Sequence, residues 1–103
     1  MNKIEQAVIY NKILGSLACA GMGDALGAAT ELYSIDEIKA QWGGFLNAFV
    51  SPPADTFAGS LNGIAGLITD DSSQMYVFSE GLIEAGFDNF TNNDWLACLL
   101  RWA

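Results

Sequence analysis

The spacing of apolar residues along the chain predicts α-helices. Ile9, Ile13 and Leu17 follow one another at intervals of four, which predicts a helix over about residues 4–21 with one buried stripe. The second half of that helix consists almost entirely of small residues. Close packing against a neighbouring helix is the favoured reason for them, and contact with a ligand is the alternative. No stretch alternates apolar and polar residues as a strand does, so the pattern favours an all-α fold.

Glycine and polar residues mark the ends of shorter helices in the first two thirds of the chain. Residues 23–31 are expected to turn into a short helix, in which Asp24 and Glu31 would lie on one face. Ser34 and Glu37 form a capping box, which predicts a second short helix through about residue 41. A long loop is expected after it, up to about residue 66.

The helical pattern returns after this loop. Apolar residues at helical spacing follow Thr69 and stop at Gly86, which predicts a longer helix. A last helix, capped by Asn93 or Asp94, is expected to reach the final residue without a C-terminal cap. We therefore expect residues 1–103 to be part of a larger helical domain.

Composition and charge narrow the classes of function. Of 103 residues, 51% are hydrophobic and 16% charged, which predicts surface that a partner or further chain covers. Twelve acidic against four basic residues give a net charge of −8, which argues against a nucleic-acid-binding surface. The chain has no histidine, which excludes histidine-based catalytic triads and the usual histidine-containing zinc sites within it.

The cysteines and the apolar runs indicate the compartment. Cys19 and Cys98 lie in apolar helical surroundings and are expected to be small buried hydrophobes in a reducing environment. The first residues show no apolar signal segment. Asp24 interrupts the longest weakly polar run, residues 13–29, which argues against a membrane span. We expect a cytoplasmic protein that does not bind membranes.

Three consecutive oxygen-bearing side chains, Thr69, Asp70 and Asp71, are the strongest candidates for chemistry. Taken alone, they are explained by a helix start, where a threonine caps and carboxylates favour the positive end of the dipole. That explanation does not cover a second acidic element, which carries Asp24 and Glu31 in Gly-rich surroundings. Two such elements in one small domain predict a site for a hard cation, because such cations select oxygen ligands.

The two elements resemble motifs of the ADP-ribosylglycohydrolase family. Residues 15–31 are similar to its N-terminal signature, a small-residue helix followed by Gly-Asp-Ala-Leu-Gly and a Glu. Residues 66–72 look like its Thr-Asp-Asp-Thr/Ser metal motif, at the matching separation. The resemblance covers nearly the whole chain and extends to dinitrogenase-reductase-activating glycohydrolases and crystallin-like relatives. It implies an all-α orthogonal helical bundle, of which this chain is the N-terminal portion.

The resemblance also implies a function and roles for individual residues. Such enzymes hydrolyse the glycosidic bond between ADP-ribose and a modified protein side chain or small acceptor, using two Mg²⁺ or Mn²⁺ ions. By position, Thr69, Asp70 and Asp71 would be metal ligands, and Asp70 would also take part in catalysis. Glu31 would be a catalytic acid or base, or would position the substrate. Asp24 would support the substrate-binding loop or the metal shell.

One part of the family pattern is missing, and it leaves an alternative open. The second metal motif, Asp-x-Asp-Thr/Ser, does not follow Asp71, so the implied two-metal site is half built. A second polypeptide or a missing C-terminal segment would complete it, and this chain alone would be inactive. The alternative is a non-catalytic structural or ADP-ribose-binding module that keeps the fold. An EF-hand-like calcium site fails, because residues 70–73 lack alternating ligands.

Overall fold

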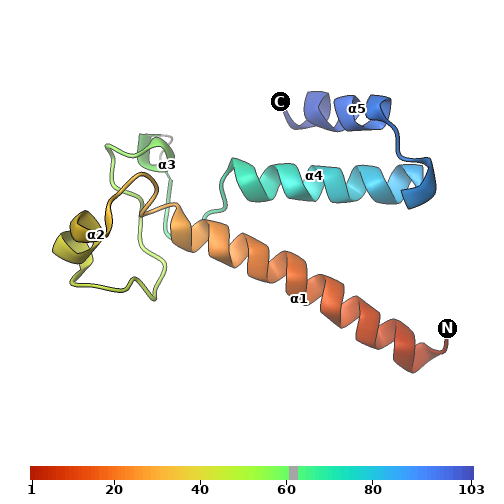
Figure 1. Ribbon diagram of the computed structural model, residues 1–103, viewed down its shortest axis with the longest axis horizontal. Helices are drawn as coiled ribbons and strands as arrows, with labels where there is room; N and C mark the ends of the chain where they lie inside the picture. Colours follow the sequence, from red (N-terminus) through yellow and green to blue (C-terminus); the bar gives the residue numbers. More distant parts are fainter. Residues whose placement is uncertain (61–62) are drawn as a thin grey trace. The chain divides into compact units, whose positions relative to one another are not determined.

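The computed structural model describes residues 1–60 and 63–103, and the described chain contains helices and loops but no strand. The all-α prediction is therefore confirmed. The chain divides into two compact units, residues 1–69 and residues 70–103, and each is described by itself. The first unit contains α1 (Lys3–Gly27), α2 (Ile35–Trp42) and α3 (Phe57–Ser60) (Figure 1). The second contains α4 (Asp70–Ala85), the 3₁₀ turn η1 (Phe87–Asn89) and α5 (Asn92–Trp102).

Helix α1 is longer than the pattern predicts. The Asn2 side chain caps its start by accepting hydrogen bonds from the backbone N–H groups of Ile4 and Glu5, and the Glu5 carboxylate accepts one from the backbone N–H of Asn2 in return. The predicted break near residue 21 is wrong, because the helix continues to Gly27. A glycine costs about 1 kcal/mol in a helix interior but keeps both of its backbone hydrogen bonds. The small residues therefore weaken α1 without ending it.

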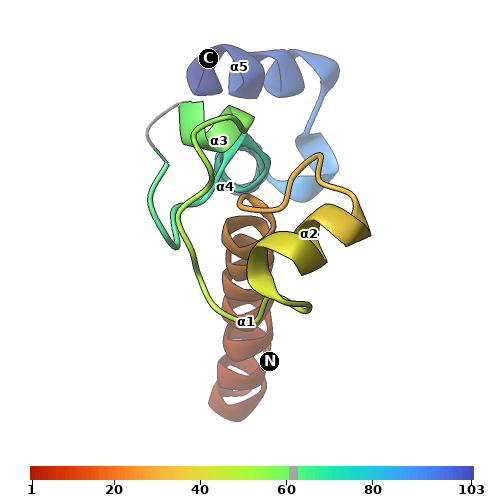
Figure 2. The same cartoon turned by 90° about the vertical axis from the view of Figure 1, so that its left-hand side faces the viewer.

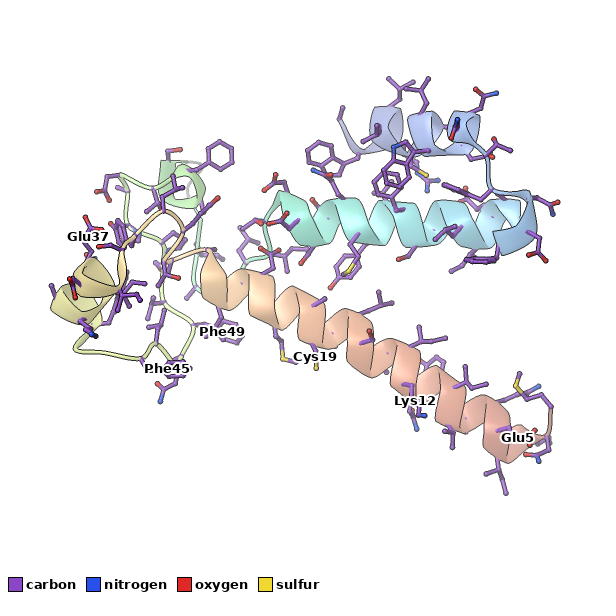
Figure 3. The ribbon with its side chains drawn as sticks, in the orientation of Figure 1. Glu5, Lys12, Cys19, Glu37, Phe45 and Phe49 are labelled. Carbon is purple, nitrogen blue, oxygen red and sulfur yellow. The ribbon has the colours of Figure 1, made fainter. Side chains whose placement is uncertain are left out.

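The predicted buried stripe on α1 is also wrong. Ile9 and Ile13 are 44% and 55% exposed, and Cys19 is exposed too. Within the first unit, α2 and α3 lie near the C-terminal end of α1 (Figures 1 and 2). Figure 3 shows Lys12 and Cys19 projecting from the long part of the helix that precedes that end. Periodicity identified the helix correctly, but burial depends on neighbours that this unit does not place there.

Helix α2 forms where its capping box predicts. The backbone N–H and the hydroxyl of Ser34 donate to the Glu37 carboxylate over 2.7 Å and 2.6 Å, and the Ser34 hydroxyl accepts from the Glu37 backbone N–H. These bonds to the ionised form lower the pKa of Glu37. The helix ends at Gly43, which has the left-handed φ of 78° expected for a C-terminal cap.

The loop after α2 is partly organised by one buried threonine. Thr56 donates its hydroxyl to the Pro53 carbonyl over 2.7 Å and accepts from the backbone N–H of Gly59 over 3.1 Å. A side chain on Gly59 would collide with the Pro53 carbonyl, so only glycine fits there. The short helix α3 results, and the sequence pattern misses it because one turn carries no periodicity.

The second unit is a helical hairpin. Helices α4 and α5 run side by side in Figures 1 and 2, joined by η1. Helix α4 stops before Gly86, which has a φ of 78°, as predicted. The predicted cap of α5 at Asn93 or Asp94 is wrong, because Thr91 is the N-cap. The Asp94 carboxylate instead accepts from the N–H and hydroxyl of Thr91, which lowers the pKa of Asp94.

Aromatic stacking, polar contacts and close packing hold this hairpin together. The rings of Phe78 and Trp95 stack with centroids 3.8 Å apart, and the Trp102 indole N–H donates to the Ser73 hydroxyl. Cys98 is buried, as predicted, beside Gly81. A side chain at Gly81 would collide with the Cys98 sulfur, so this glycine is what allows α4 and α5 to approach closely.

A pair of glycine substitutions tests this packing. Gly15→Ala meets open space on α1 and should stabilise the protein by about 0.5–1 kcal/mol through helix propensity. Gly81→Ala is the same change in α4, but overpacking should destabilise it by about 1–3 kcal/mol. Urea unfolding of both variants measures these changes in the free energy of unfolding. Adding Cys98→Ala should relieve part of the Gly81→Ala loss, and equal effects at both glycines would disprove the close approach.

The α5 cap makes stability depend on pH. A carboxylate with a lowered pKa stabilises the folded state above its ordinary pKa, and that contribution is lost as pH falls through the lowered value. Thr91→Ala should therefore raise the pKa of Asp94 and reduce the loss of stability in acid. Carboxyl NMR titration measures the pKa directly. Thr91→Ser keeps the hydroxyl and should retain the lowered value; a raised value in that variant would contradict the assignment.

Candidate functional site

Two candidate residues that are far apart in the sequence meet within the first unit. The Asp24 carboxylate accepts two hydrogen bonds from Thr69, one from its backbone N–H over 2.8 Å and one from its hydroxyl over 2.5 Å. Asp24 lies near the end of α1, and Thr69 immediately precedes α4. Both groups are partly buried. The two acidic elements of the sequence are therefore joined through a carboxylate–threonine clasp.

The position of Asp24 is electrostatically unfavourable for the helix that carries it. The expected turn before Asp24 is absent, so this carboxylate occupies the last turn of α1, near the negative end of the helix dipole, and that turn has no basic residue. This placement costs about 0.3–1 kcal/mol. Hydrogen bonds to a charged group contribute about 1.5–3 kcal/mol each. The two bonds from Thr69 therefore outweigh the dipole cost and hold the carboxylate in place.

Asp70 and Asp71 follow Thr69 directly and form the first turn of α4. Both are exposed, and the positive end of the helix dipole favours their charge. In the described residues, no three acidic, cysteine or histidine side chains gather closely enough to hold a metal ion. Asp70 and Asp71 are thus carboxylates presented at a helix start, next to the clasped Thr69.

Glu31 does not share a face with Asp24. Helix α1 ends at Gly27, so the predicted helix through Glu31 is wrong. The spacing of seven residues therefore does not place Asp24 and Glu31 on one helix face. Glu31 lies exposed in the following turn, beside Leu32, which has a φ of 67°. A left-handed leucine is strained, and this one is 92% exposed.

The donor types of the Thr69–Asp71 segment suit a hard divalent cation. A hydroxyl and two carboxylates are oxygen ligands of the kind that Mg²⁺ and Mn²⁺ take. The Thr69 hydroxyl donates its hydrogen bond to Asp24, so its oxygen lone pairs are directed away from that carboxylate. Lone pairs are what a metal ligand offers. Asp24 therefore leaves the lone pairs of the Thr69 hydroxyl available to a metal ion. The Thr69–Asp71 segment alone does not surround such an ion.

The sequence contained one signal for the clasp that the pattern analysis missed. An acidic residue in the last turn of a long helix is unfavourable unless a partner compensates it. The predicted end of α1 near residue 21 concealed this signal, because it placed Asp24 at the start of the next helix, where an acidic residue is favourable. Only the continuous helix to Gly27 shows that Asp24 requires a donor.

Comparison with protein-family models gives a match over most of the chain. The model of the ADP-ribosylglycohydrolase family, described as ADP-ribosylglycohydrolase, matches residues 5–103. The chain belongs to the ADP-ribosylglycohydrolase family. Family membership supports the hydrolysis of glycosidic bonds at the level of the class. Neither the curated proteins nor the solved structures gave a match, so similarity to particular family members stays a prediction.

The contribution of the Asp24–Thr69 clasp to the stability of this family member can be measured. Asp24→Asn should lower the free energy of unfolding by about 1–2 kcal/mol, because the lost charge-assisted bonds exceed the relieved dipole cost. Thr69→Val removes only the hydroxyl bond. A double-mutant cycle by urea unfolding should give a coupling energy of about 0.5–3 kcal/mol. Asp36→Asn, an equal charge change at an exposed position of α2, is the control and should stay within about 0.5 kcal/mol.

Additive effects of Asp24→Asn and Thr69→Val would contradict a direct bond between the two side chains. Thr69→Ser gives an independent check. It keeps the donor hydroxyl and should preserve most of the stability that Thr69→Val loses.

Proposed function

We propose that this chain supplies Thr69, Asp70 and Asp71 as ligands to a divalent-metal site that hydrolyses ADP-ribosyl linkages of proteins or small molecules. The observation that carries the proposal is the clasp, since Asp24 accepts both hydrogen bonds from Thr69, the residue that begins the proposed ligand triplet. Acidic residues that only stabilise the start of a helix need no such partner. Family membership supports the same class of reaction.

The proposed cofactor is Mg²⁺ or Mn²⁺, with two ions in the complete site. Both ions prefer carboxylate, hydroxyl and water oxygens. When bound, such ions stabilise negative charge that develops on substrate oxygens. They would also offset the repulsion between an anionic ADP-ribosyl substrate and a chain of net charge −8.

Each side chain of the proposed site has its own part. Asp24 is a positioning residue, because it acts on Thr69 and holds the hydroxyl in one orientation. Asp70 and Asp71 offer exposed carboxylates as metal ligands, and Asp70 also takes part in catalysis by stabilising the positive charge of an oxocarbenium-like transition state. Glu31, exposed on a strained turn, is proposed to reach the substrate and relay a proton or orient a ribose hydroxyl.

The proposed site needs further ligands. Two octahedral ions take about six oxygen ligands each, and water supplies only some of them. Three consecutive residues cannot surround both ions. We therefore propose that a second polypeptide or a further segment provides the other half, and that the 103-residue chain is catalytically inactive by itself.

A non-catalytic module is the second candidate, and it is compatible with the same clasp. The two hydrogen bonds from Thr69 to Asp24 stabilise the first unit whether or not a metal binds. In that case the acids at the start of α4 serve the helix dipole alone, and the chain contributes structure or binds ADP-ribose without cleaving it.

Calorimetry with Mn²⁺ and then with ADP-ribose separates the two candidates. The catalytic proposal predicts weak binding of Mn²⁺ to the chain, with a dissociation constant of about 10⁻⁴–10⁻³ M, as for sites with few protein ligands. Paramagnetic broadening by Mn²⁺ should be strongest at the amides of Thr69, Asp70 and Asp71. Asp70→Asn and Asp71→Asn should remove both signals, and in the completed enzyme they should abolish hydrolysis.

Asp36→Asn is the matched control, because Asp36 is also an exposed acid in the first turn of a helix. It tests whether Mn²⁺ is merely attracted by the negative charge of the chain. Equal broadening near Asp36 and Asp70 would rule out a metal site at α4. Heat with ADP-ribose but none with Mn²⁺ would favour the non-catalytic module.

A further inference from the structure

The first unit contains an apolar pocket that is separate from the proposed metal site. The end of α1, helix α2 and the loop after α2 enclose about 500 Å³, within the range of small-molecule pockets. Neither Asp24, Glu31 nor Thr69 lines it. The lining residues, which are mostly apolar, are Leu26, Gly27, Thr30, Ile35, Ile38, Lys39, Gly44, Phe45 and Leu46.

The polar groups in the pocket wall are few. The hydroxyl of Thr30 donates to the carbonyl of Gly27 over 3.1 Å, so local backbone already uses that donor. Lys39 is the one charged residue in the lining. Glu37, two residues earlier on α2, lies with Tyr33 beside a different cavity. The wall therefore carries a cation and no carboxylate.

This charge is unusual for the molecule, which has twelve acidic and four basic residues. In the part of the chain that the structure describes, no ion pair involves Lys39. A lysine can lay its methylene groups along an apolar wall and keep its ammonium in water at the mouth. The C-terminal end of α2 contributes about half a negative charge there, less than the full charge of the ammonium. The lining of the pocket therefore carries one positive charge.

Large apolar side chains at this pocket are left in contact with water. Ile35 is 70% exposed and Phe45 is 91% exposed. Figure 3 shows Phe45 on the loop that follows α2. An apolar body in the pocket would cover part of these side chains, which favours binding by about 25 cal/mol for each Å² removed from water.

We propose that this pocket binds a small carboxylate with an apolar body, such as a medium-chain aliphatic acid. The body lies against Leu26, Ile38 and Leu46, and the carboxylate faces the Lys39 ammonium. An alcohol of the same length fits the apolar wall equally well and lacks the charge. The carboxylate therefore gains affinity from Lys39 alone, and the site is independent of any metal.

Octanoate and octanol are matched probes for the two parts of the proposal. Titration of the full chain at pH 7, followed by amide NMR, should show both probes shifting residues of α2 and the following loop. Octanoate should bind about threefold to fivefold more tightly, as one partly screened ion pair allows. Lys39→Gln should remove that difference and leave octanol binding unchanged. Lys12→Gln, the same change on α1 away from the pocket, should change neither.

A second pair of variants tests the apolar wall. Ile35→Asn should weaken both probes by a similar factor, because Ile35 lines the pocket yet is too exposed to be needed for folding. Ile83→Asn is the control, since Ile83 is 80% exposed on α4 and outside the pocket. Equal binding of octanoate and octanol to the unmodified chain overturns the carboxylate assignment. Shifts that survive Ile35→Asn unchanged overturn the pocket itself.

Discussion

The two hydrogen bonds from Thr69 to the Asp24 carboxylate are the interaction on which the candidate site depends. They compensate a charge that the end of α1 disfavours, and they fix the residue from which α4 begins. A single side chain thus links a helix end to a segment 45 residues later. The proposed ligand role of Thr69 is supported by this link, because the carboxylate accepts the hydrogen bond of the hydroxyl and the oxygen lone pairs point elsewhere.

The acidic residues of this chain fall into two groups. One group is committed to structure: Glu37 and Asp94 belong to capping boxes, and Glu84 pairs with Arg101 across the α4–α5 hairpin. The other group consists of exposed carboxylates at helix ends and turns, which include Glu31, Asp70 and Asp71. Charge of the second kind is available to a cation or a substrate. This division is the physical basis for proposing a site at the start of α4 and in the turn after α1.

Both units also expose more apolar surface than a small domain usually carries. Ile4 on α1 and Leu100 on α5 are each more than 70% exposed. Helices α4 and α5 use only one face of each helix for their contact. In the described residues, no helix combines the length and hydropathy of a membrane span. The apolar surface is consistent with the proposal that another polypeptide segment completes the site.

Local chemistry determined much of the secondary structure from the sequence alone. The capping box at Ser34, the left-handed glycines at 43 and 86, and the beginning of α4 after Thr69 all depend on residues within one or two helical turns. The motifs that resemble the ADP-ribosylglycohydrolases were equally readable, since they are contiguous, and the family match confirms membership of that family.

Only the tertiary structure decided which side chains are buried and which residues they contact. Cys19 and Cys98 have similar apolar surroundings in sequence, yet one is exposed and the other lies against Gly81. Asp24 looked like a helix start, and its role became visible only when α1 continued past it to meet Thr69. The pocket at Lys39 likewise combines residues from three separate segments. Such features rest on contacts between residues tens of positions apart, which no local pattern encodes.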